Sequence, residues 1–216
     1  MKITIREPGS AITHYVAMML AMLGAVPLLM KATYSQDIEH VIAMFIFICS
    51  MVLLYGASTL YHSVNLTGRA LKIFKKIDHM MIFVLIAGSY TPVCMLVLEK
   101  ELGYPLLGLV WGTAAIGMLM KLFWVTCPKW VSSVIYIAMG WECVLVFRPL
   151  LDTLPIGAFL WLLIGGIIYT IGGVIYALKV PVLDRLHKYF GLHEIFHLFV
   201  MGGSFCHFMF MFLYVA

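Results

Sequence analysis

Residues 156–178 read IGAFLWLLIGGIIYTIGGVIYAL, an apolar run without a charged side chain. A helix needs roughly 20 apolar residues to cross the hydrocarbon core of a bilayer, so this stretch predicts a membrane-spanning helix. Similar runs, separated by charged or Pro- and Gly-rich breaks, occupy approximately residues 12–30, 40–61, 78–98, 104–125, 131–150 and 192–215. We therefore expect an all-α protein, a bundle of seven transmembrane helices that forms a single domain over residues 1–216.

The composition excludes several other classes of protein. Of 216 residues, 63% are hydrophobic and 11% are charged, and the mean hydropathy is +1.04. A soluble domain is about half apolar and about a quarter charged, so a soluble domain, a disordered chain, a coiled coil and a nucleic-acid-binding domain are excluded. A transmembrane β-barrel is excluded because its strands alternate polar and apolar residues, whereas these runs are continuous.

The distribution of Lys and Arg predicts the orientation of the bundle. Eleven of the 14 lie before the first apolar run, at the end of the fourth run (Lys121), or in the loops that follow the second, fourth and sixth runs. The other three are Lys31, Lys100 and Arg148. Because short loops rich in Lys and Arg stay in the cytoplasm, we expect a cytoplasmic N-terminus and an outer C-terminus.

The five cysteines are predicted to be reduced packing residues. They are odd in number, have no paired spacing, and are Cys49, Cys94, Cys127, Cys143 and Cys206. Four of the five lie inside or at the edge of apolar runs. A buried free cysteine behaves as a small hydrophobic residue. We therefore expect neither a disulfide framework nor a thiolate metal site.

Polar and ionisable residues gather at one predicted end of the bundle. Ser58 and His62 close the second run, Asp78 opens the third, and His193 and His197 open the last. The predicted orientation brings all three places to the cytoplasmic side. Ionisable residues at membrane depth are costly and indicate function, so this convergence predicts a functional site.

The residue types favour a metal. His193 and His197 are four residues apart, so both imidazoles project from one helix face, and His62 can supply a third ligand. Three imidazoles leave the fourth position of a tetrahedral Zn²⁺ open, as in catalytic zinc sites. Asp78 is then a fourth ligand or, in our preferred interpretation, the carboxylate that deprotonates a bound water, and the Ser58 hydroxyl can bond the water, Asp78 or an oxyanion.

Simpler interpretations stay open. The histidine pair can decorate a membrane interface without a metal, and Ser58 can bond back to its own helix. His14 can support the site or line a pore, Glu7 can favour a helix N-terminus, and His79 faces another direction. His207 lies too far from His197 to share its metal. His40 and His187 are loop residues without an assigned role.

Several motifs together resemble one family. They are, in order, Glu7-Pro8, Thr13-His14, Ser58-x-x-x-His62, Asp78-His79, residues 87–92 (AGSYTP), residues 139–141 (MGW), His193-x-x-x-His197 and residues 203–208 (GSFCHF). This set resembles the bacterial hemolysin III family, the prokaryotic branch of the progestin and adipoQ receptors, which include the adiponectin receptors. The resemblance extends over nearly the whole chain.

The resemblance implies a multi-pass protein of the bacterial plasma membrane with zinc bound at His62, His193 and His197. The family's aspartate and serine match Asp78 and Ser58. In eukaryotic relatives the site is associated with hydrolysis of ceramide-like lipid amides, and the wider superfamily contains alkaline ceramidases. The bacterial name comes from cytolytic, pore-forming activity, and some members are linked to membrane-energy and lipid homeostasis.

Two functional hypotheses follow. The first is a zinc-dependent hydrolase whose substrate is a membrane lipid amide or ester that enters between the helices. The second is a non-enzymatic protein, either a pore or a sensor whose zinc is structural. Few polar residues lie in the spans outside the cluster, which argues against a pore within one chain, but an oligomeric pore stays open.

Overall fold

The computed structural model describes residues 5–180 and 190–216. The helices are α1 (Pro8–Thr33), α2 (Ile38–Ser63), α3 (Gly68–Pro92), η1 (Val93–Val97), α4 (Lys100–Phe123), α5 (Lys129–Gly140), η2 (Glu142–Val146), α6 (Phe147–Thr153), α7 (Ile156–Leu178), α8 (Leu192–Phe210) and η4 (Met211–Val215). Within the described residues, seven segments are long and apolar enough to cross a membrane. The prediction of an all-α, seven-span protein is confirmed.

The helix bounds differ most from the apolar runs where polar residues join a helix. α3 begins at Gly68, well before the run at 78, because the basic turns that precede Asp78 are helical although they are polar. The fifth span is not one regular helix, since α5 passes through the 3-10 turn η2 into the short α6. Hydropathy marks only the apolar part of a helix and does not detect such a break.

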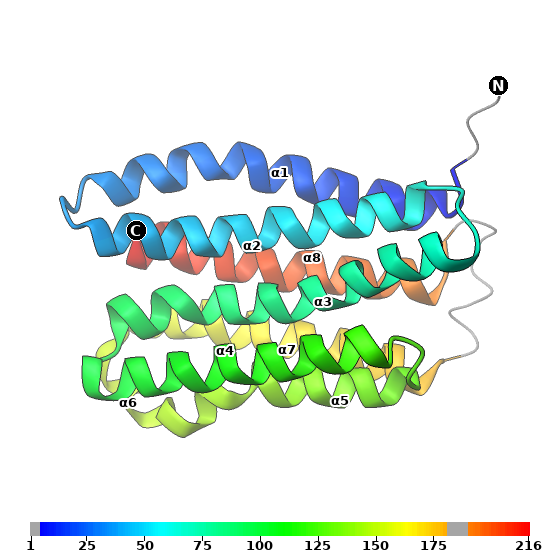
Figure 1. Ribbon diagram of the computed structural model, residues 1–216. Helices are drawn as coiled ribbons and strands as arrows, with labels where there is room; N and C mark the ends of the chain where they lie inside the picture. The colour runs from blue at the N-terminus through cyan, green and yellow to red at the C-terminus, as the bar shows by residue number, and fades with distance from the viewer. Residues whose placement is uncertain (1–4, 181–189) are drawn as a thin grey trace.

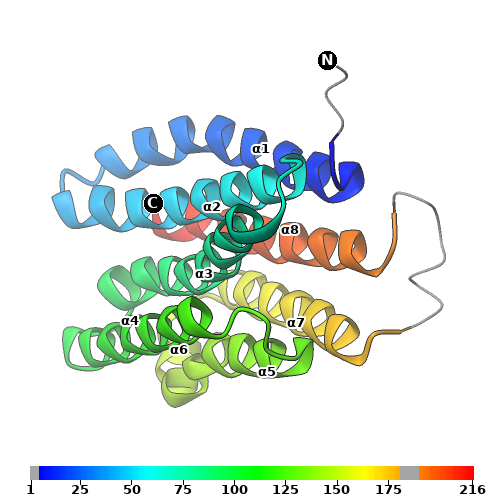
Figure 2. The same ribbon diagram turned by 45° about the vertical axis from the view of Figure 1, so that its right-hand side comes forward.

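The spans form a ring. Consecutive helices α1 to α4 pack against one another, α5 packs on α7, α7 packs on α8, and α8 closes the ring against α1. Figures 1 and 2 show α8 lying beside α1 and α2, and they place the start of α1 and the C-terminal residue 216 at opposite ends of the bundle. The ring therefore brings helix α1 into contact with helix α8.

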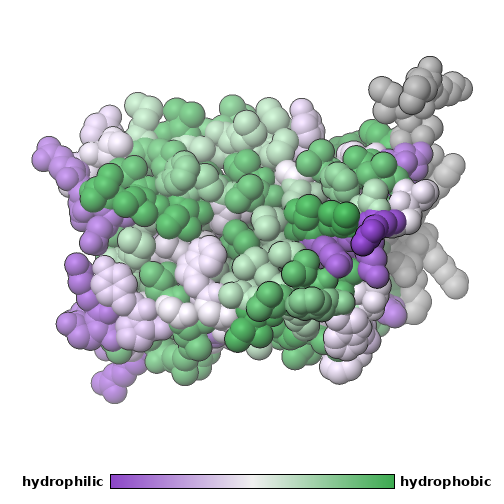
Figure 3. All heavy atoms as spheres, viewed as in Figure 1, coloured by the Kyte–Doolittle hydropathy of each residue, from purple (hydrophilic) through white to green (hydrophobic). Residues whose placement is uncertain are grey.

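The outside of the ring is apolar. Figure 3 shows hydrophobic side chains over the middle of this face and hydrophilic ones toward its two ends. Large apolar side chains such as Leu23, Ile116 and Leu178 are exposed by 68%, 71% and 70%. Such a belt suits contact with lipid.

The cytoplasmic position of the N-terminus stays a prediction. Three of the charges on which that prediction depends, Lys2, Arg185 and Lys188, lie outside the described residues, as does His187.

Two helix contacts depend on glycine. A Cβ added to Gly203 of α8 would lie 2.7 Å from the Tyr169 ring of α7, and one added to Gly165 of α7 would lie 2.5 Å from His207 of α8. Small residues let helices approach closely in a bilayer, so these positions fix how α8 sits on α7. Gly108 and Gly112 of α4 face open space instead.

Candidate metal centre

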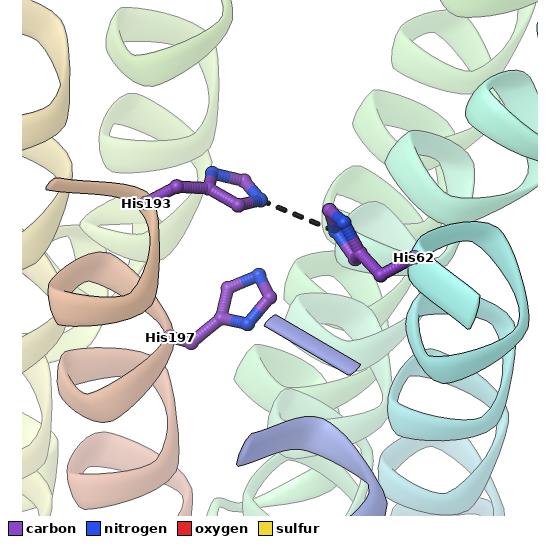
Figure 4. A group of neighbouring side chains, drawn as sticks. All are labelled: His62, His193 and His197. Atoms are coloured by element: carbon purple, nitrogen blue, oxygen red, sulfur yellow. Dashed lines mark hydrogen bonds between the residues drawn. The ribbon is translucent and has the colours of Figure 1, made fainter. Parts of the chain in front are cut away.

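Three histidines from two helices face one another at one end of the ring. His62 lies in the last turn of α2, and His193 and His197 lie in the first two turns of α8. The Nε2 atoms of His62 and His193 are 3.2 Å apart, and one nitrogen from each of the three rings lies within 4.8 Å of the others. Figure 4 shows the three rings pointing into the same space.

This spacing fits a metal ion. Two imidazole nitrogens bound to one tetrahedral zinc at about 2.1 Å lie about 3.4 Å apart, close to the distance between His62 and His193. Imidazole also binds iron, copper and nickel, so the donor set indicates a metal without selecting one. The predicted ligands are thus brought together as a candidate metal-binding triad.

Glu7, immediately before α1, determines which nitrogen of His62 faces the cluster. Its carboxylate is hydrogen-bonded to Nδ1 of His62, and its backbone N–H donates to the His62 carbonyl at 3.0 Å. The hydrogen bond with His62 lowers the pKa of Glu7 to about 2, so the carboxyl is ionised at neutral pH. Because an ionised carboxylate only accepts hydrogen bonds, Nδ1 carries the proton and the Nε2 lone pair is free for a metal.

Thr13 likewise determines which nitrogen of His197 faces the cluster. Its hydroxyl donates to backbone carbonyls of its own helix, with Gly9 at 3.1 Å and Ser10 at 2.9 Å. The hydroxyl oxygen therefore accepts from Nδ1 of His197 at 3.1 Å. The Nε2 lone pair of His197 is again left for a metal, and such supporting bonds raise ligand basicity.

The first turn of α1 also anchors α8. Ser10 donates a hydrogen bond to Glu194, whose other carboxylate oxygen accepts the Gly191 N–H at 2.8 Å. Glu194 thereby caps the N-terminus of α8. Since Glu194 lies between the two histidines of α8 in sequence, this contact fixes the turn that carries them.

Asp78 and Ser58 lie beside the triad. Asp78 is 7% exposed and close enough to His62 and Ser58 to interact with both. Ser58 is 1% exposed, and its hydroxyl faces the Asp78 carboxylate. The hydroxyl can therefore bond Asp78, a water or a ligand.

A long cavity starts at this cluster. It has a volume of about 450 Å³ and is lined by the triad, Ser58 and Asp78 at one end. Its walls continue through apolar residues of the inner ring, such as Leu85, Val93 and Phe159, and past His207. His207 lies ten residues beyond His197, or about 15 Å along α8 at 1.5 Å per residue. The cavity is therefore a polar site joined to a deep apolar chamber.

The remaining histidines have separate places. His14 stacks on His197 with ring centroids 3.5 Å apart, and neither of its nitrogens has a partner among the described residues. His79 also lines the cavity, and its Nε2 is 3.9 Å from the Asp78 carboxylate. His207 lies deep in the chamber, with Nε2 3.4 Å from the Leu162 carbonyl.

Comparisons with known proteins identify the family of the chain. The family model described as "Haemolysin-III related" matches residues 3–208. The chain is 35% identical to Hemolysin-3 of Bacillus cereus over 198 residues, which is 92% of this chain and 86% of that protein. It is 37% identical to the Hemolysin-3 homolog of Bacillus subtilis (strain 168) over 203 residues, 93% of this chain and 91% of that protein. With seven membrane-spanning helices and a match over most of its length, the chain is a multi-pass integral membrane protein that belongs to the haemolysin-III-related family.

Proposed function

We propose that this protein is a zinc-dependent hydrolase of a membrane lipid amide or ester, with its site at the cytoplasmic side of the plasma membrane. The observation that carries the proposal is the junction of a three-histidine cluster, a buried carboxyl and a buried hydroxyl with a deep, largely apolar cavity. The histidine triad would hold the ion through Nε2 of His62 and His197 and a nitrogen of His193. Zinc bound in this way supplies a Lewis acid and ionises water near neutral pH.

The side chains of the site and the cavity have separate roles in the proposed reaction. The apolar chamber takes the acyl chain and holds the lipid carbonyl at the polar end of the cavity. Asp78 accepts the proton of the attacking water and returns it to the leaving amine or alcohol. Ser58 donates a hydrogen bond to the carbonyl oxygen as negative charge develops there.

Metal content and turnover test the proposal separately. Elemental analysis of detergent-purified wild type should give about one zinc per chain. His62→Ala and the double variant His193→Ala/His197→Ala should lose it. In a screen of lipid amides and esters, Asp78→Asn should keep the zinc and lose at least about 100-fold in turnover. Metal-free wild type would refute the zinc site, and full activity of Asp78→Asn would refute the assignment of the base.

The names of the two relatives favour a second candidate, lysis of membranes by a pore. Leakage of a trapped dye separates the candidates when vesicles of ester lipids are compared with vesicles of ether lipids. A pore releases the dye from both. A hydrolase acting on the bilayer lipids releases it only from the ester vesicles, because only they yield detergent-like products.

A further inference from the structure

A second cluster of reactive side chains lies where α4 meets α5, apart from the histidine triad. Lys121, in the last turn of α4, is 0% exposed. Its ammonium donates to Ser132 in the first turns of α5 and to Sγ of Cys127 in the connection, the latter at 3.1 Å. Cys127 Sγ and Ser132 Oγ are themselves 3.2 Å apart. From the sequence, Lys121 is predicted to be a loop charge and Cys127 a packing residue, and no contact between them is predicted.

The charge balance of this cluster is unusual. Throughout the described residues, no carboxylate lies within ion-pairing distance of Lys121. A buried ammonium without a counterion costs several kcal/mol, and its two hydrogen-bond partners are a hydroxyl and a thiol. Of the two, only the thiol is acidic enough to ionise. Transfer of the thiol proton of Cys127 to the neutral amine of Lys121 gives a thiolate–ammonium pair, in which the buried ammonium has a counterion.

The thiol is also within reach of a ligand. Cys127 and Ser132 line the same cavity as the histidine triad, at the end where α4 meets α5. The same lining includes the apolar residues Val125 and Ile82 together with the polar residues Lys129 and Ser133. A reagent that carries a hydrocarbon tail can therefore enter the cavity and present its reactive end to the thiol.

We propose that Cys127 is a covalent modification site for lipid-derived α,β-unsaturated carbonyl compounds, with Lys121 as the residue that activates it. The Cys127 thiolate forms a C–S bond to the β-carbon, and the electrons of the C=C bond move into the carbonyl to give an enolate. The proton held by Lys121 then passes to the α-carbon. The thiol is thus added across the double bond, no group leaves, no oxidant is required and the amine ends neutral.

The experiment measures adduct formation in the purified full-length chain. The protein is treated with trans-2-dodecenal, the products are fixed with borohydride, and peptide mass spectrometry gives the rate at each of the five cysteines. Cys143 is the matched control, because it lines the same cavity, is more exposed than Cys127, and has a backbone carbonyl at 3.8 Å and the Tyr90 hydroxyl, rather than an amine, as hydrogen-bond partners. An unactivated thiol is only a few per cent thiolate at neutral pH, so Cys127 should react about tenfold faster after its lower intrinsic nucleophilicity is included.

Two further measurements separate the parts of the proposal. Lys121→Met removes the ammonium but keeps the length of the chain, and it should lower the rate at Cys127 to that at Cys143. A short enone without a tail should react more slowly at both cysteines and keep the preference for Cys127, because both thiols line the same cavity and only Cys127 contacts Lys121. Equal rates at the two cysteines in wild type would overturn the proposal, and so would an unchanged rate in Lys121→Met. The comparison within wild type stands even if Lys121→Met does not fold.

Discussion

Replacement of Glu7 by glutamine should weaken metal binding about tenfold. The change preserves the size of the side chain and the backbone bond to His62, and it removes the charge that holds the proton on Nδ1. The pKa of Glu7 falls from its ordinary 4.5 to about 2, mainly through the hydrogen bond with His62 and to a smaller extent through Arg6, against the opposing effect of burial. Each pKa unit corresponds to about 1.4 kcal/mol, so the unscreened contacts of the carboxylate together contribute about 3 kcal/mol.

Solvent reduces that value. The Glu7 side chain is 46% exposed, and a half-exposed charge is screened by water. Halving the interaction gives about 1.5 kcal/mol, which is about a tenfold loss of affinity and agrees with the 10- to 100-fold loss typical of residues that support metal-bound histidines.

The assay is competition for zinc with a chromophoric chelator, using protein in detergent. Glu39→Gln is the matched control, because Glu39 is a half-exposed carboxylate whose only described ion pair is with Lys100 at 3.8 Å. That control should bind zinc like wild type. Wild-type affinity in a folded Glu7→Gln protein would refute the role we assign to the carboxylate.

Three other changes test neighbouring features. Thr13→Val, which removes the acceptor for a ligand histidine but keeps the side-chain shape, should also lower zinc affinity about tenfold in the chelator assay. Ser58→Ala should leave metal content unchanged and lower turnover about 100-fold, as expected for a lost oxyanion donor; equal turnover would show that the hydroxyl has no such role. Gly203→Val forces a side chain into the Tyr169 ring and should cost about 1–3 kcal/mol, seen as a lower melting temperature, whereas Gly108→Ala faces open space and should not.

The sequence predicts the bundle well because the signal for a membrane span is local. Continuous apolar runs give the number of helices, and the i, i+4 spacing of His193 and His197 gives their common face. Loop charges then place His62 and Asp78 at the same end. These inferences need only the periodicity of the sequence and the side of the membrane on which each loop lies. The structure agrees with the all-α, seven-span prediction and brings the predicted side chains into one cluster.

The contacts of α1 with that cluster could not be predicted, because they depend on how the ring closes. Glu7 and Thr13 lie far from their histidine partners in sequence, and nothing local selects α8 as the neighbour of α1. A signal was present, since Ser10, Thr13 and His14 share a helix face in an otherwise apolar segment. The Lys121–Cys127–Ser132 cluster is short in sequence, but hydropathy assigns its lysine to solvent and only packing shows that it is buried.

The closure of the ring has a consequence for the synthesis of the protein. His62 and its Glu7 partner leave the ribosome well before His193 and His197, which belong to α8. Until α8 docks against α1, one candidate ligand is in place and there is no triad. Metal binding at the proposed site would therefore require that α8 has docked against α1.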